Sequence, residues 1–425
     1  MRRTTTTIIG LGLTALVASS AIAKEAPTPK AVLTTYADIA LAKYEDSLTT
    51  AKTLQQKVAA LLKSPTAGTL SAAREAWLAA RVPYQQTEVY RFGNAIVDDW
   101  EGKVNAWPLD EGLIDYVAGE YGDSSEENEL YTANIIANPK IKISGRDVDA
   151  STITKKMLSE TLHEAGGVEA NVATGYHAVE FLLWGQDLNG TGKGAGARKA
   201  SDFDVANCTN GNCDRRGEYL RVATELLVDD VAWMVDQWKA DGAARKNLLE
   251  GDPTAGLTAI FTGLGSLSYG ELAGERMKLG LLLNDPEEEH DCFADNTHNS
   301  HFYNVIGMRN VYFGSYTRID GSKVSGASPS DLVKSADATA DERLRKALDV
   351  SLTAFTALKK RAETVEAYDQ MLAEGNDAGN KTVDTAVQAL VAQTPEITRA
   401  VSALKLKAIT FEGSDSLDDP SKVLQ

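Results

Sequence analysis

The stretch LAKYEDSLTTAKTLQQKVAAL at residues 41–61 indicates the fold class. Its apolar side chains recur at steps of three and four residues, at Leu41, Tyr44, Leu48, Ala51, Leu54, Val58 and Leu61. This spacing places them on one stripe of a long amphipathic helix. Strand-like alternation is scarce, and similar helical stretches follow at about 69–97, 151–186, 215–248, 254–283, 340–375 and 381–408. The sequence therefore predicts an all-α protein built from helical bundles.

The length of the chain predicts two domains, because 425 residues exceed the size at which one hydrophobic core keeps growing. Residues 189–213 are rich in Gly and Asn and lack periodic apolar residues. We therefore predict a flexible linker there, between helical-bundle domains at 24–188 and 214–425. The sequence Pro-Thr-Ala-Gly occurs at both 65–68 and 253–256. This repeated sequence favours two bundles related by duplication. We expect a site near their interface, with ligand residues supplied by both bundles.

The N-terminus has the pattern of a cleavable signal peptide. Residues 1–3 carry two arginines, residues 8–18 form an apolar run, and Ala-Ile-Ala at 21–23 is the small-x-small pattern that precedes cleavage. The run is well short of the roughly 20 residues that span a bilayer. We expect residues 1–23 to be removed, leaving a mature chain without a transmembrane segment. No Cys near the cut could carry a lipid, so we place the protein in the periplasm or peripherally at the outer membrane.

The charge of the chain argues against nucleic acid as a partner. The formal charge of −17 becomes −19 when Arg2 and Arg3 are removed with the signal peptide. An acidic surface repels phosphate backbones and anionic lipids, and it attracts cations. We therefore expect a cation or a neutral ligand.

Histidine is rare in this chain, and one histidine lies in an apolar helical stretch. His177 belongs to GYHAVEFLLWG at 175–185, and Glu180 follows three residues later. Residues three apart on a helix project from nearly the same face, so the two side chains can converge on one ion. Nitrogen and oxygen donors suit iron, zinc or copper, and Gly175 allows close approach of a ligand or another backbone. The alternative is a hydrogen-bonded structural pair, and two donors alone do not complete a site.

A second dense patch, DPEEEHDCFADNTHNSHFYNVIGMRN, occupies residues 285–310. Its acidic and imidazole side chains are Asp285, Glu287, Glu288, Glu289, His290, Asp291, Asp295, His298 and His301. Donors at this density could complete a cation site. The alternative is a solvated acidic loop before a capped helix, which we favour for residues 287–289. His298 and His301 precede aromatic residues, which indicates a partly buried helix start, and we expect one of them to line a pocket.

A third patch is WPLDEG at 107–112, after a predicted helix that carries Arg81 and Glu88. A Trp-Pro pair is unlike helix and can form a rigid pocket wall, although simple loop packing is the alternative. Further candidate ligands are His298, Glu88, Asp110 and Glu275, and candidate pocket residues are Arg81, Trp107, Gly175 and His301.

The cysteines predict one local disulfide. Cys208 and Cys213 flank the turn-forming sequence Thr-Asn-Gly-Asn, in a compartment that permits disulfides. A metal pair is the alternative, but no second Cys pair or neighbouring His completes a zinc set. Cys292 is left over as a buried free thiol.

Three blocks together resemble a known family. GYHAVEFLLWG at 175–185 resembles the Gly-x-His-x-x-Glu motif of the imelysin family, and WPLDEGLIDY at 107–116 looks like the loop that precedes it. The stretch from GELAGERM at 270–277 to DCFADNTHNSHFYN at 291–304 resembles the iron-regulated protein A branch. The resemblance covers most of the mature chain.

The resemblance implies two packed helical bundles, a functional site near their interface and a location in the cell envelope. It also implies a relation to the helical domain of EfeO-type iron-uptake proteins, in which the motif is associated with metal binding. Carried over residue by residue, the motif falls on Gly175, His177 and Glu180.

The family is also classed with metallopeptidases, after insulin-cleaving members. The HExxH zinc motif is absent from this sequence, because its one His-Glu dipeptide, at 163–164, is followed by glycine at 167. We assign no catalytic residue. Our interpretation is an exported protein that binds a metal ion, iron before zinc or copper, in iron uptake or homeostasis, with envelope iron-transport components as partners. The alternatives are an envelope metallopeptidase and a receptor for a siderophore, haem or glycan.

Overall fold

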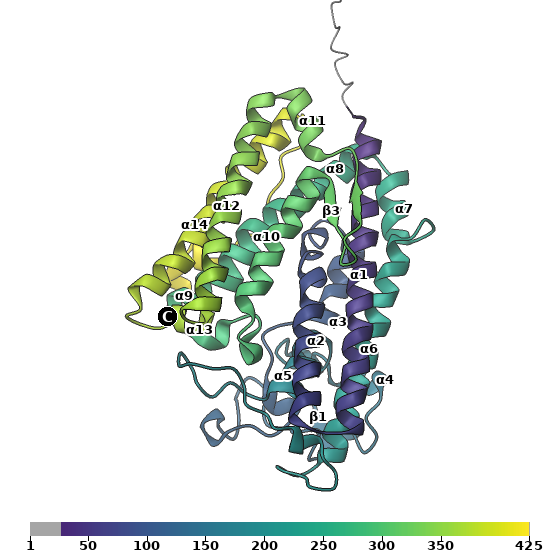
Figure 1. The fold of residues 1–425 in the computed structure, drawn as a ribbon, viewed down its shortest axis with the longest axis vertical. Coiled ribbons are helices and arrows are strands. Elements are labelled where there is room, and N and C mark those ends of the chain that lie inside the picture. Colours follow the sequence, from purple (N-terminus) through teal and green to yellow (C-terminus); the bar gives the residue numbers. More distant parts are fainter. Residues whose placement is uncertain (1–26, 425) are drawn as a thin grey trace, which may run out of the picture.

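The computed structural model describes residues 27–424 and confirms the all-α fold (Figure 1). The predicted signal peptide at 1–23 lies outside the described residues. Within the described part, no helix is both long enough and apolar enough to cross a bilayer.

Helices make up nearly all of the regular structure. The first half contains α1 (Pro29–Lys63), α2 (Ala67–Gln85), α3 (Ala95–Asn105), α4 (Lys155–Met157), α5 (Gly175–Trp184), α6 (Cys213–Trp238) and α7 (Ala243–Glu250). The second half contains α8 (Pro253–Ser266), a π-helical segment (Leu267–Lys278), α9 (Leu279–Leu283), α10 (Thr297–Phe313), α11 (Pro329–Ala336), α12 (Ala338–Thr364), α13 (Tyr368–Leu372), α14 (Asp377–Ala403) and α15 (Asp415–Asp418). Two short antiparallel hairpins are β1 (Lys140–Ile143) with β2 (Arg146–Asp149), and β3 (Ser315–Thr317) with β4 (Lys323–Ser325).

The first bundle is organised around α1. The side chain of Thr28 accepts a hydrogen bond from the Ala31 amide, and proline follows as the first helical residue, which is a favourable helix start. Most of the predicted stripe of α1 is buried, with Leu54 and Leu61 fully covered, and Leu41 and Leu48 are partly buried. Helices α2 and α6 pack against α1, and α5 packs against both α2 and α6 (Figure 1).

The second bundle consists mainly of α10, α12 and α14. Helix α12 packs on α14 and on α10, and α14 packs on the π-helical segment. The two bundles meet where α10 contacts α2 and where α8 contacts α1 (Figure 1). Because α6 packs along α1, a boundary at 189–213 would split one bundle. We therefore propose that the first domain extends through α7.

The duplication remains a prediction. The two Pro-Thr-Ala-Gly sequences both lie at helix starts, but in different registers. Thr66 is the N-cap residue of α2, whereas Pro253 is already the first residue of α8.

Several predicted helices were too long. The helix expected at 215–248 is divided into α6 and α7, and the one expected at 340–375 is divided into α12 and α13. The helix expected at 69–97 ends at Gln85, shortly after Pro83, because proline has no amide hydrogen and disrupts a helix interior. The helix expected at 151–186 is interrupted between residues 162 and 175. There the chain turns at Gly166 and Gly167, whose φ angles are 74° and 78°.

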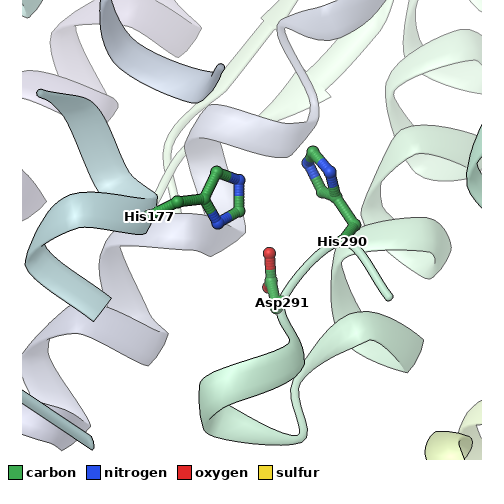
Figure 2. Close-up of side chains that lie close together, drawn as sticks. All are labelled: His177, His290 and Asp291. Atoms are coloured by element: carbon green, nitrogen blue, oxygen red, sulfur yellow. The ribbon is translucent and has the colours of Figure 1, made fainter. Parts of the chain in front are cut away.

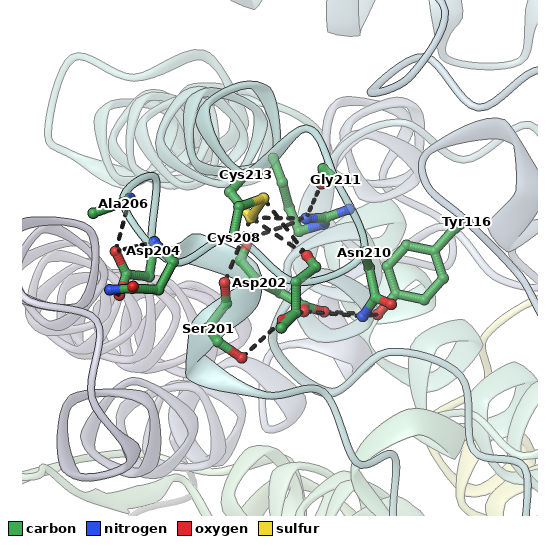
Figure 3. The surroundings of a disulfide bond; sticks show 12 residues. Tyr116, Ser201, Asp202, Asp204, Ala206, Cys208, Asn210, Gly211 and Cys213 are labelled. Carbon is green, nitrogen blue, oxygen red and sulfur yellow. Dashed lines mark hydrogen bonds between the residues drawn. A yellow bond between two sulfur atoms is a disulfide. The ribbon is translucent and has the colours of Figure 1, made fainter.

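The predicted linker at 189–213 is fastened to the first bundle. Cys208 and Cys213 form the expected disulfide, and Asp202 accepts hydrogen bonds from neighbouring polar side chains (Figure 3). Arg198 donates to Asp115 at 2.7 Å, with both side chains buried. The segment therefore differs from the flexible link that its glycines predicted. Cys292 is a free thiol, and it is partly rather than fully buried.

A buried lysine joins the two bundles. The fully buried Lys43 on α1 donates hydrogen bonds to the carbonyl oxygens of Gln86, at 2.8 Å, and of Gly307 on α10, at 3.4 Å. Its ammonium also lies 5.2 Å from the centre of the Tyr90 ring. Burial lowers the pKa of Lys43 well below 10.5, since a low dielectric disfavours the charged form.

This lysine should give the fold a specific pH dependence. Where the folded chain has lost the Lys43 proton and the unfolded chain keeps it, the free energy of unfolding rises with pH. Below pH 10.5 we expect the free energy of unfolding of the wild type to rise with pH relative to a Lys43→Met variant, with a limiting slope of about 1.4 kcal/mol per pH unit. Urea denaturation of both proteins measures this difference, and parallel pH profiles would contradict it.

Candidate metal centre

Helix α5 brings the predicted motif into the interior. All ten of its residues are buried, with His177 1% exposed and Glu180 fully covered. Gly175 begins the helix with a φ of 79°, and a Cβ there would lie 2.5 Å from the carbonyl oxygen of Val104. Glycine is therefore required where α5 starts against the end of α3.

His177 and Glu180 form a hydrogen-bonded pair. His177 Nδ1 lies 2.9 Å from Glu180 Oε2, and Glu180 Oε1 accepts from the Ala294 amide at 3.0 Å. Both carboxylate oxygens are thus engaged. By contrast, the buried Nε2 of His177 has no hydrogen-bond partner among residues 27–424. The carboxylate therefore orients the imidazole and leaves its other nitrogen free.

His290 and Asp291 lie opposite His177 (Figure 2). Each of the three side chains offers one ligand atom, and these atoms lie within 4.8 Å of one another. The rings of His177 and His290 meet edge to face, with centroids 4.7 Å apart. His290 Nδ1 is buried and lacks a hydrogen-bond partner in the described chain. The cluster thus combines α5 with the segment that precedes α10.

Asp291 is held by a buried polar network. Its Oδ1 accepts from Arg81 at 2.7 Å, and its Oδ2 accepts from Asn296 at 2.7 Å and from the Ser300 hydroxyl. Arg81 also donates to Asn105 Oδ1 at 2.6 Å. Because Arg81 offsets the charge of Asp291, this carboxylate can remain ionised in the interior.

The protonation states suit metal binding. Burial, together with Arg81, lowers the pKa of His177 to about 3, and burial lowers the pKa of His290 well below its usual value. Burial alone would raise the pKa of Asp291, but Arg81 and the other partners outweigh it, so the net shift is downward. At neutral pH both imidazoles are therefore neutral and the carboxylate is charged, as metal ligands must be.

The donor set fits a transition-metal ion. Two imidazole nitrogens and one carboxylate oxygen are a combination found with non-haem iron(II), and imidazole also suits zinc and copper. A buried polar atom without a partner is uncommon in a folded protein and calls for an explanation. His177 Nε2 and His290 Nδ1 are two such atoms, whereas His290 Nε2 lies 3.3 Å from Asn105 Nδ2.

The additional carboxylates named from the sequence lie elsewhere. Glu88 accepts from Arg276 at 2.7 Å, in a buried ion pair. Asp110 is partly buried and accepts from Asn128. Glu275 is exposed and faces the segment around residues 413–418. None of the three belongs to the group of donors around His177.

Four candidate residues remain. Arg81 and Trp107 contact residues of the centre, whereas His298 and His301 do not belong to the group of donors around His177. Arg81 binds Asp291, and the Trp107 ring lies 5.9 Å from that of His290. His298 makes its contact with Asn299, at 3.0 Å. His301 is fully buried, with its ring 5.4 Å from that of Tyr368. His301 therefore lines the interior rather than an open pocket.

Sequence reasoning did not select His290 and Asp291. They belong to the donor-rich patch at 285–310, for which a cation site was one interpretation and a solvated loop, favoured for residues 287–289, was the other. The available signal was a His-Asp pair within that patch, in a chain that has five histidines.

Comparison with known proteins establishes the family. A family model described as imelysin matches residues 40–397, which include α5 and the segment before α10. This chain belongs to the imelysin family.

Relatives of this imelysin carry iron-related names. Iron-regulated protein A of Synechococcus elongatus is 33% identical over 75 residues, which are 18% of this chain and 21% of that protein. The match therefore spans about a fifth of the relative's length. A solved structure from Parabacteroides distasonis, described as a candidate iron-regulated protein A precursor, shares the fold with a TM-score of 0.63. It is 19% identical, and the alignment covers 90% of this chain and 97% of that one.

Proposed function

We propose that this imelysin is an exported protein of the cell envelope that binds a metal ion, with iron preferred over zinc and copper, and acts in iron uptake or homeostasis. The observation that carries the proposal is the pair of buried, unpartnered imidazole nitrogens beside Asp291. The iron-related names of the relatives support the choice of iron.

Each residue of the centre has a distinct role in this proposal. His177, through Nε2, His290 and Asp291 are the ligands. Glu180 is a positioning residue that holds His177 through Nδ1, since metal-bound histidines commonly direct their other ring nitrogen at a carboxylate. This role replaces the direct ligation that the sequence predicted for Glu180.

The burial of the centre favours ion binding over peptide cleavage. His177, His290 and Asp291 are at most 2% exposed. A polypeptide substrate would have to reach the ion together with an attacking water and a proton acceptor. A bare ion needs far less room. Envelope iron-transport components are the partners that such a carrier requires.

Titration of metal-free mature protein tests the proposal. We expect one equivalent of iron(II), added without oxygen, to bind, and zinc(II) and copper(II) to compete for the same site. Glu180→Gln should weaken binding by about 10- to 100-fold, because the orienting carboxylate is lost, and Glu180→Asp should recover part of the affinity.

A matched control is Glu363→Gln, which removes a carboxylate paired with Lys359 on α12. This variant should bind like the wild type. The function is wrong if none of the three ions binds, and the role of Glu180 is wrong if its glutamine variant keeps full affinity.

A further inference from the structure

A second cluster of acidic side chains lies beside the first centre. Asp187, Asp295 and Asp369 place carboxylate oxygens within 4.8 Å of one another. Asp187 and Asp369 also line a small, partly enclosed space with Glu287 and Glu289. That space leaves about 10 Å³ for the centre of a water-sized particle, which is enough for roughly one ion or water molecule.

The four acidic residues come from three segments of the chain. Asp187 follows α5, Asp369 lies in α13, and Glu289 and Asp295 lie on either side of His290 and Asp291 in the segment before α10. Nothing in their sequence spacing brings them together, so the cluster is a product of the tertiary fold.

The cluster contains buried carboxylates that have no partner. Glu289 is 1% exposed and Asp369 is 2% exposed. Neither oxygen of either carboxylate makes a hydrogen bond within residues 27–424, and Asp295 Oδ1 also lacks one. Burial and the negative charges of Asp369, Asp295 and Asp187 raise the pKa of Glu289, and the nearby Thr297 hydroxyl partly opposes them.

Such an arrangement is stabilised either by protonation or by a compensating positive charge. Burying an ionised carboxylate is costly unless it is paired or coordinates a metal. Like charges held together also raise the pKa, and burial with these neighbours raises the pKa of Asp295 and of Asp369 to about 7.

The donor atoms indicate the class of cation. All are carboxylate oxygens, which suit hard ions such as calcium and magnesium rather than zinc or copper. Magnesium demands shorter, near-octahedral geometry and usually keeps several waters, for which this space has little room.

We propose that Asp187, Glu289, Asp295 and Asp369 form a second cation site that binds calcium. Glu289 directly precedes His290, so one short segment supplies both sites. Calcium would tie this segment to α13 and to the chain after α5. The second site therefore has a structural consequence for the first, because it fixes the position from which His290 and Asp291 project.

Calcium titration of chelator-treated, full-length mature protein tests this site. We expect calorimetry with CaCl₂ to show one bound ion and the melting temperature to rise with added calcium. Glu289→Gln and Asp369→Asn should each weaken calcium binding by about tenfold or more. Both variants remove a buried like charge, so we expect them to fold in the absence of calcium.

Three controls separate this site from the iron centre. Glu288→Gln changes the same loop by the same charge, but Glu288 does not line the enclosed space, and this variant should bind calcium normally. His177→Ala should also retain calcium binding, and MgCl₂ should bind more weakly than CaCl₂. The proposal is wrong if calcium does not bind, if the Glu289 and Asp369 variants bind it unchanged, if His177→Ala abolishes its binding, or if magnesium binds more tightly.

Discussion

Alanine at position 177 or 290 is expected to weaken iron(II) binding by about 100-fold or more, which corresponds to about 2.8 kcal/mol or more of binding free energy. Each substitution removes one of three protein ligands and leaves the other imidazole with a free nitrogen. Both native histidines are neutral at pH 7, so neither variant removes a buried charge. Competition with a chromophoric chelator of known affinity measures the loss, and circular dichroism verifies the fold.

His298→Ala is the matched control for these variants. His298 lies in the same sequence patch as His290, but its ring contacts Asn299 instead of the donor group. We expect this variant to bind iron like the wild type. Loss of binding in His298→Ala, with retention in His177→Ala, would contradict the assignment of the centre.

The sequence predicted the fold class because helix periodicity is a local property. Five of the seven stripe residues between Leu41 and Leu61 are buried in α1, and Leu41 and Leu48 are partly buried. The same pattern did not show where helices stop, because Pro83 and the pair Gly166-Gly167 end them through backbone geometry. A stripe also does not identify the helix that it packs against, and so the packing of α6 on α1, in the first bundle, was not foreseen.

The candidate site was predictable only in part, for a related reason. His177 and Glu180 share one helix, so their contact follows from a spacing of three residues. The contact between His177 and His290 joins residues more than a hundred positions apart. Only the packing of the segment before α10 against α5 creates it. Carboxylates such as Glu88 looked equally suitable in sequence, but Arg276 neutralises Glu88 in the folded chain.

The segment before α10 also shows why composition alone misled the interpretation. Acidic residues in a row usually form a solvated surface, and the exposure of Glu287 agrees with this. Yet Glu289, His290 and Asp291 are each at most 2% exposed. The side chains of Glu289 and Asp291, two residues apart, lie in different surroundings. Glu289 lines the acidic space, whereas Asp291 forms an ion pair with Arg81.

Replacing Asp291 by asparagine is expected to destabilise the metal-free protein by about 3–5 kcal/mol, because it leaves the Arg81 guanidinium buried without its charge partner. Among the described residues, Asp291 is the acidic side chain that forms an ion pair with Arg81, and both are at most 1% exposed. Urea denaturation in the presence of a chelator measures the loss as a lower midpoint with an unchanged slope. The same variant should lose iron binding, since one anionic ligand is gone.

A double variant separates the structural role of Asp291 from its role as a ligand. Replacing a whole buried ion pair by apolar residues of similar volume is often neutral or stabilising. We therefore expect Arg81→Met combined with Asp291→Leu to recover most of the stability that Asp291→Asn loses. Iron binding should not return, because the carboxylate is still absent. Recovery of both properties would show that Asp291 supports the centre without binding the ion, and recovery of neither would show that the polar network, with Asn105 and Ser300, requires the charged pair.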